Sequence, residues 1–85
     1  MIKPYWTVYR ARHVVAYLTV LRTEGEELRR AIHMLQSGIP DDARKLQETP
    51  ETWEWLEARH WITFVVVDRS KQWLYVTDVE SATVA

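Results

Sequence analysis

The chain has 85 residues, a length that suits one domain, and its net charge is −1. Hydrophobic residues make up 47% of it, which argues against disorder, and the absence of cysteine rules out a disulfide framework and a thiolate zinc site. The 11 basic residues are balanced by 12 acidic ones, so the chain lacks the positive charge typical of non-specific nucleic-acid binding.

The first predicted element is a strand over residues 5–9, where aromatic and β-branched residues are concentrated. Further along, apolar residues recur at helical spacing, at Val14, Leu18, Leu21, Leu28, Ile32 and Leu35. The beginning of this segment, residues 13–21, is also rich in strand formers. A second strand there, giving a ββαββ order, therefore stays open as an alternative to a helix.

Gly25 interrupts the helical stripe of apolar residues. Around it, Thr23 and Glu26 have the spacing of a capping box, in which each side chain bonds the backbone N–H of the other residue. The pattern predicts two helices stacked as a hairpin, over residues 12–22 and 24–36. A glycine and a proline shortly after the second helix predict its end.

The middle of the chain gives conflicting signals. Residues 39–48 are mostly polar and predict a connecting segment. Thr49 and Pro50 have the pattern of a helix start, with threonine as N-cap and proline in the first helical position. Trp53 and Trp55, in contrast, alternate with glutamate as in a strand. Both helix and strand stay open for this segment.

The C-terminal part predicts a β-hairpin of residues 62–67 and 73–79 around a polar turn at residues 68–71. The second strand is expected to place four residues on one face: Trp73, Tyr75, Thr77 and Val79. Residues 80–85 are expected to form a frayed tail. The predicted fold is α+β, with an N-terminal strand, a two-helix hairpin and an antiparallel sheet that ends in this hairpin.

Five tryptophans are many for so short a chain. Core filling is the ordinary role of this residue, but a domain of this size has little room for so many indole rings. Exposed aromatic side chains are enriched at protein interfaces. We therefore predict a partner-binding surface formed by Trp53, Trp55, Trp61 and Trp73.

Candidate chemistry is sparse. No two of the three histidines have metal-ligand spacing, and we expect no metal and no cofactor. Arg59 and His60 stand beside Trp61, a combination that suits phosphate and base contacts, and together with Arg69 they are the candidate catalytic residues. Further candidates for nucleic-acid or phosphate contact are Arg44, Lys45 and Lys71.

The apolar stretches are too short for a membrane span, and no signal-peptide core follows the first residues. We therefore expect a single cytoplasmic domain over residues 1–85 that makes no contact with a membrane.

The order of these segments resembles the RelE/ParE superfamily of bacterial type II toxins, with the best local match over residues 31–79. The matching pieces are AIHMLQSGIP at residues 31–40, DARKL at residues 42–46, Pro50 with Trp53, ITFVVVD at residues 62–68 and the strand over residues 73–79. The resemblance implies a RelE/ParE-like fold, in which residues 14–21 are helical and residues 53–57 form a strand. It also implies an antitoxin as partner, and gyrase or the ribosome with its mRNA as target.

The ribonucleases of this superfamily use basic residues on the sheet and near the C-terminus. Here Leu56 or Glu57 stands where the strand before the central one usually offers an arginine, and the central strand begins with Trp61 and Ile62. The tail, ESATVA, carries no basic residue. Because loss of positive charge at a developing oxyanion costs orders of magnitude in rate, the resemblance gives little support to ribonuclease activity.

Three functions follow from this. The first is a RelE/ParE-like toxin, or a non-catalytic derivative, that acts through protein contacts and is neutralised by an antitoxin. The second is an mRNA endoribonuclease with a non-standard basic site drawn from Arg59, His60, Arg69 and Lys71. The third is an unrelated small α+β interaction module, for which a homodimer through an exposed edge strand is possible.

Overall fold

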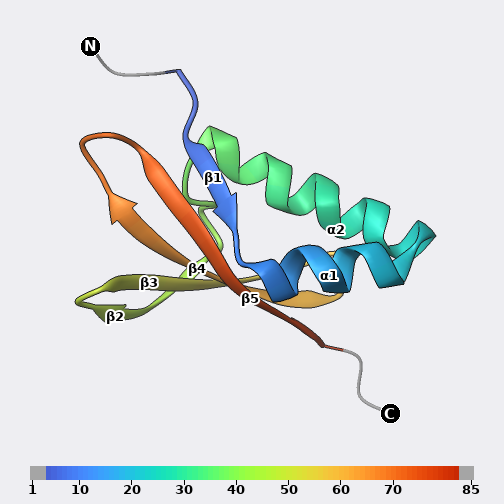
Figure 1. Ribbon diagram of the computed structural model, residues 1–85. Coiled ribbons are helices and arrows are strands. Elements are labelled where there is room, and N and C mark those ends of the chain that lie inside the picture. The colour runs from blue at the N-terminus through green and yellow to red at the C-terminus, as the bar shows by residue number, and fades with distance from the viewer. Residues whose placement is uncertain (1–3, 83–85) are drawn as a thin grey trace.

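The structure, a computed structural model, describes residues 4–82 as five strands in one sheet with two helices packed on one face (Figure 1). The elements are β1 (Thr7–Arg10), α1 (Arg12–Leu21), α2 (Thr23–Met34), a 3-10 turn (Leu35–Ser37), β2 (Arg44–Glu48), β3 (Glu51–Glu57), β4 (His60–Asp68) and β5 (Trp73–Ser81). The strand order is β1-β5-β4-β3-β2, in which β1 runs parallel to β5 and the other pairs are antiparallel. The predicted α+β fold is confirmed. Over residues 4–82 no helix has the length and apolar character of a membrane span.

The helical hairpin follows the apolar stripe. Val14 and Leu18 of α1 and Leu28 and Ile32 of α2 are buried against the sheet. Because burial at helical spacing stabilises a helix despite several strand-forming residues, the ββαββ alternative is wrong. One residue, Arg22, joins the helices with a φ of 55°.

This single-residue connection overturns the predicted capping box. Because the connection is so short, Thr23 already belongs to α2 and is not its N-cap. No side chain caps the helix there. Gly25, expected to separate the helices, lies inside α2 and is buried.

The sheet buries one face under the helices. The side chains on that face include Trp55, Ile62, Phe64, Leu74 and Val76, all within the main core. No helix covers the opposite face of the sheet within residues 4–82, and this surface is called the outer face below (Figure 1).

Three segments differ from the expectation. The second half of the connecting segment is strand β2, because its backbone pairs with β3. Thr49 and Pro50 form a turn and not a helix start, since the residues after them pair with strands on both sides. Glu80 and Ser81 belong to β5, because they pair with Trp61 and His60 of β4. The rest of the predicted tail lies outside the described residues, apart from Ala82, whose N–H donates to the carbonyl of residue 59.

The second strand of the C-terminal hairpin does not keep one face throughout. Thr63 pairs with Asp78 and Phe64 with Val76, so Thr77 is an extra residue in β5. A bulge of this kind reverses the alternation of side chains beyond it. Val79 therefore packs against the core, on the face opposite that of Trp73 and Tyr75.

Candidate functional site

The candidate catalytic residues lie at opposite ends of the sheet. Arg59 is in the turn before β4 and His60 begins that strand, whereas Arg69 follows its end. At about 3.3 Å per strand residue, roughly 30 Å separate the backbones of His60 and Arg69. The structure therefore does not bring them to one substrate phosphate.

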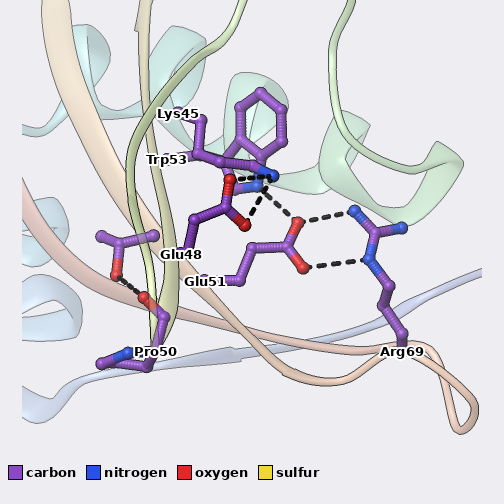
Figure 2. Close-up of polar contacts among 7 residues, drawn as sticks. Lys45, Glu48, Pro50, Glu51, Trp53 and Arg69 are labelled. Carbon is purple, nitrogen blue, oxygen red and sulfur yellow. Dashed lines mark hydrogen bonds and ion pairs between the residues drawn. The ribbon is translucent and has the colours of Figure 1, made fainter.

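Arg69 is held by a carboxylate. Its Nε donates to Glu51 Oε1 over 2.9 Å and its Nη2 to Oε2 over 2.5 Å, while Trp53 Nε1 donates to the same Oε2 over 2.8 Å (Figure 2). The hydrogen bond from Arg69 lowers the pKa of Glu51, and the bond from Trp53 adds to this. A carboxylate bound on both sides in this way competes with any phosphate for the guanidinium.

The other candidate phosphate contacts are engaged too. Lys45 Nζ lies 3.3 Å from both carboxylate oxygens of Glu48 and 5.3 Å from the ring of Trp53 (Figure 2). Arg44 pairs with Glu54 across the β2–β3 ladder, and Lys71 lies 4.9 Å from the ring of Trp73. These cations balance carboxylates or cover aromatic rings, so they do not form a cluster open to RNA.

Replacing Glu51 with glutamine tests the pairing with Arg69. Because the pKa of Glu51 is lowered in the folded protein, its ion pair stabilises the fold fully above the ordinary value of 4.5 and loses this effect as the pH falls through the lower folded value. Arg69 is more than half exposed, so we expect Glu51→Gln to cost no more than about 1 kcal/mol at pH 7. Urea unfolding of both proteins should show this difference vanish well below pH 4.5. A difference that stays constant with pH would contradict the ion pair.

A polar pocket of about 530 Å³ lies at the other end of the sheet, beside the β3–β4 turn. It is lined by Tyr17, Thr23, Glu24, Glu27, Ala58, Arg59, His60 and Ser81. Within residues 4–82, His60 is the only buried polar or charged residue, with 6% of its surface exposed. This pocket is called the His60 pocket below.

Two hydrogen bonds orient the His60 ring. Nδ1 lies 2.7 Å from the carbonyl oxygen of Ala58, and Nε2 lies 2.9 Å from the hydroxyl of Tyr17. Because a carbonyl oxygen only accepts, Nδ1 carries a proton, and in the neutral ring Nε2 accepts from the tyrosine. The pair could exchange a proton, but Glu24 and Glu27 place two carboxylates at this pocket against the single charge of Arg59. That balance opposes the approach of a phosphodiester.

The turn that carries His60 is strained. Ala58 and Arg59 have φ values of 53° and 61°, and they form the two-residue connection between Glu57 and His60 of the β3–β4 hairpin. Such hairpins require positive φ at both positions and ordinarily use asparagine and glycine, which tolerate it. The hydrogen bond from the His60 ring to Ala58 and the pairing of the flanking strands hold this turn in place.

Replacing Tyr17 with phenylalanine should destabilise the protein by about 1–3 kcal/mol, because it leaves Nε2 of a buried histidine without its hydrogen-bond donor. Chemical denaturation with the native protein as reference measures this. The matched control is Tyr9→Phe, whose side chain is about half exposed on the outer face and should change stability by less than about 0.5 kcal/mol. Equal effects of the two substitutions would mean that the Tyr17–His60 hydrogen bond does not contribute to the free energy of unfolding.

The predicted tryptophan surface divides between the two faces of the sheet. Trp55 is 3% exposed and Trp53 packs at the edge of the core, so the expectation of an exposed side chain is wrong for Trp55. Strand pairing places the indole of Trp55 on the face that the helices cover, opposite Ile62. Trp61 and Trp73 lie on the outer face, where Trp61 is 39% exposed.

The outer face carries further apolar side chains besides the predicted tryptophans. They are Tyr9, Leu56, Val67 and Tyr75, each between 39% and 52% exposed. Leu56 pairs with Trp61 across the β3–β4 ladder, and the rings of Tyr9 and Trp73 meet edge to face with centroids 6.3 Å apart. Successive side chains of a strand point to opposite faces, so carrying this alternation from each strand to its neighbour would have placed these residues on one face. Exposed apolar groups gathered on one face are typical of a protein interaction surface.

Comparison with solved structures shows the fold. The chain matches a chain in the crystal structure of the archaeal RelE–RelB complex from Pyrococcus horikoshii OT3 with a TM-score of 0.76 and 14% sequence identity, over 94% of this chain and 98% of that one. No protein family and no curated protein sequence matches. The fold is therefore RelE-like, as the order of the sequence segments predicted.

Proposed function

We propose that this protein is a toxin component of a type II toxin–antitoxin system, or a non-catalytic derivative of one, that acts through protein contacts in the cytoplasm and is neutralised by an antitoxin protein. One observation carries the proposal: the sheet presents an uncovered apolar face, while four candidate cations are paired with carboxylates or aromatic rings, namely Arg44, Lys45, Arg69 and Lys71. The RelE-like fold supports the toxin class, since the matched structure is a complex of RelE with RelB.

The geometry favours protein contact over RNA cleavage. A non-standard ribonuclease site was expected to draw on Arg59, His60, Arg69 and Lys71, but these residues form two pairs at opposite ends of β4, so each end offers only part of the set. Positioning groups for phosphoryl transfer requires them within about 3.5 Å of the reacting atoms. The target of such a toxin would then be a protein, for which gyrase is the candidate that the resemblance offers.

Inducible expression in a bacterial host tests the proposal. We expect growth to stop while total mRNA stays intact, and growth to recover when the small reading frame adjacent to this gene is expressed as well. Co-purification of the two products measures the complex directly. A complex without growth arrest would identify the non-catalytic derivative, cleaved mRNA would replace the proposal by the ribonuclease, and neither arrest nor complex would overturn it.

A further inference from the structure

The His60 pocket has walls of opposite charge. Arg59 contributes a guanidinium from the β3–β4 turn, and Glu24 and Glu27 contribute two carboxylates from the beginning of α2. None of these three side chains forms an ion pair with another residue of the described range 4–82. The pocket therefore keeps two negative charges and one positive charge available to a bound molecule.

The buried wall of the pocket offers a hydrogen-bond acceptor. Because the hydroxyl of Tyr17 donates to Nε2 of the neutral His60 ring over 2.9 Å, the phenolic oxygen keeps its lone pairs for a further donor. The His60 ring has no donor left, since its Nδ1–H is bound to the carbonyl oxygen of Ala58. This feature is independent of the glutamates, and it favours the same kind of ligand, one that carries cationic N–H groups.

The size of the pocket suits a small molecule. Its volume of about 530 Å³ lies within the range of about 300–1,000 Å³ that is usual for small-molecule sites. The rings of Tyr17 and His60 meet edge to face with centroids 5.5 Å apart, and Ala58 also lines the pocket, so an aliphatic chain can lie against apolar surface. Hydrogen bonds hold both rings, which means that this wall is formed before a ligand arrives.

We infer that the His60 pocket binds a free basic amino acid, of the class of arginine and lysine. Such a molecule carries one carboxylate and two cationic groups, which is the charge pattern opposite to that of the pocket. Its carboxylate would meet the guanidinium of Arg59, where two parallel hydrogen bonds can form. Its α-ammonium and its side-chain cation would meet Glu24 and Glu27. This binding site does not depend on the proposed function.

Charge and spacing separate this ligand from others. Glu24 and Glu27 are three residues apart on one helix, a spacing of about 5–6 Å between Cβ atoms, so each can meet a different cationic group. A phosphate would face two carboxylates, and a polyamine would bring a cation against Arg59. A neutral amino acid would leave one carboxylate without a partner. Only a basic amino acid among these compensates all three charges.

A nuclear magnetic resonance titration of the isotope-labelled full chain tests the inference. The ligands are arginine, lysine, agmatine, which is arginine without its carboxylate, and citrulline, in which a neutral urea group replaces the guanidinium. Arginine should bind about tenfold or more tightly than agmatine or citrulline, because each of these lacks one charge-assisted contact. Its affinity should fall as salt increases. Failure of both arginine and lysine to bind in the millimolar range, or equal affinity of arginine, agmatine and citrulline, would overturn the inference.

Substitutions then locate each contact. Arg59→Asn should abolish the discrimination between arginine and agmatine, and asparagine tolerates the positive φ of this position, so the turn is kept. The double change Glu24→Gln with Glu27→Gln should abolish the discrimination between arginine and citrulline. Glu26→Gln is the matched control, because this exposed residue of α2 does not line the pocket and should leave both preferences unchanged. Preferences that survive in the pocket variants would place arginine elsewhere and contradict the inference.

One further ligand separates a free amino acid from the end of a peptide. Nα-acetylarginine lacks the α-ammonium, as an arginine at the C-terminus of a peptide does, and should bind about tenfold or more weakly than arginine. Equal binding would assign the pocket to a peptide end and overturn the free amino acid. Arginine binding by a protein that shows neither growth arrest nor an antitoxin complex would overturn the toxin alone. Growth arrest by a protein that binds no basic amino acid would overturn this inference alone.

Discussion

Replacing Trp55 with alanine should lower the free energy of unfolding by about 3–5 kcal/mol. The indole is 3% exposed, fills the core under the helices, and donates from Nε1 to Asp42 Oδ1 over 3.0 Å. The substitution leaves a cavity and removes the hydrogen bond that ties the segment before β2 to the sheet. Since small domains have total stabilities of about 5–15 kcal/mol, the loss should be plain in a urea titration.

Trp61→Ala is the matched counterpart, because the same residue type lies on the opposite face of the same sheet. Trp61 is 39% exposed and lies between Leu56 of β3 and Glu80 of β5 on the uncovered face, outside the main core, so the cost in stability should stay below about 1 kcal/mol. If the outer face is the interaction surface of the proposed function, this change should weaken binding of the product of the adjacent reading frame by about 2 kcal/mol or more, as truncated tryptophans at interface centres do. Unchanged affinity for that product would show that the interface lies elsewhere than on the outer face.

The hairpin at the C-terminal end of the chain could be predicted because its information is local. Residues 62–67 and 73–79 are rich in β-branched and aromatic side chains, and a polar turn separates them, as the structure confirms. The bulge at Thr77 could not be predicted, since it depends on how β5 pairs with β4. One extra residue was enough to move Val79 to the other face.

Strand β2 was missed for a physical reason. All five of its residues are exposed, so it has no apolar face that periodicity could reveal. It is a strand because β3 offers it a backbone ladder, and its charged side chains suit the edge of a sheet. The extension of β5 to Ser81 was missed for the same reason. Its last residues have no strand-like pattern of their own and are ordered by pairing with β4.

The contacts of the candidate site could not be predicted from the sequence either, because they join distant parts of the chain. Residue types alone identified Arg59, His60 and Arg69 as able to contact phosphate, but their partners come from distant parts of the chain. Glu51 is 18 residues from Arg69, and Tyr17 is 43 residues from His60. Whether a cation is available to a ligand is decided by such pairs, which the topology creates.

Adding a side chain at Gly25 should destabilise the helical hairpin, although alanine is the better helix former. A Cβ atom at this position would lie 2.7 Å from the carbonyl oxygen of Leu18 and 3.2 Å from Cβ of Leu21. Helix propensity favours alanine by about 1 kcal/mol, but overpacking costs about 1–3 kcal/mol, and a backbone oxygen cannot rotate away as a flexible side chain can. We expect Gly25→Ala to lose up to about 2 kcal/mol in net stability and Gly25→Leu about 3 kcal/mol or more.

Urea unfolding of each variant against the native protein measures these losses. Glu26→Ala is the matched control, because this neighbouring residue of α2 is exposed and its substitution should change stability by less than about 0.5 kcal/mol. A Gly25→Ala protein more stable than the native one would mean that helix propensity outweighs the close contact with the carbonyl oxygen of Leu18.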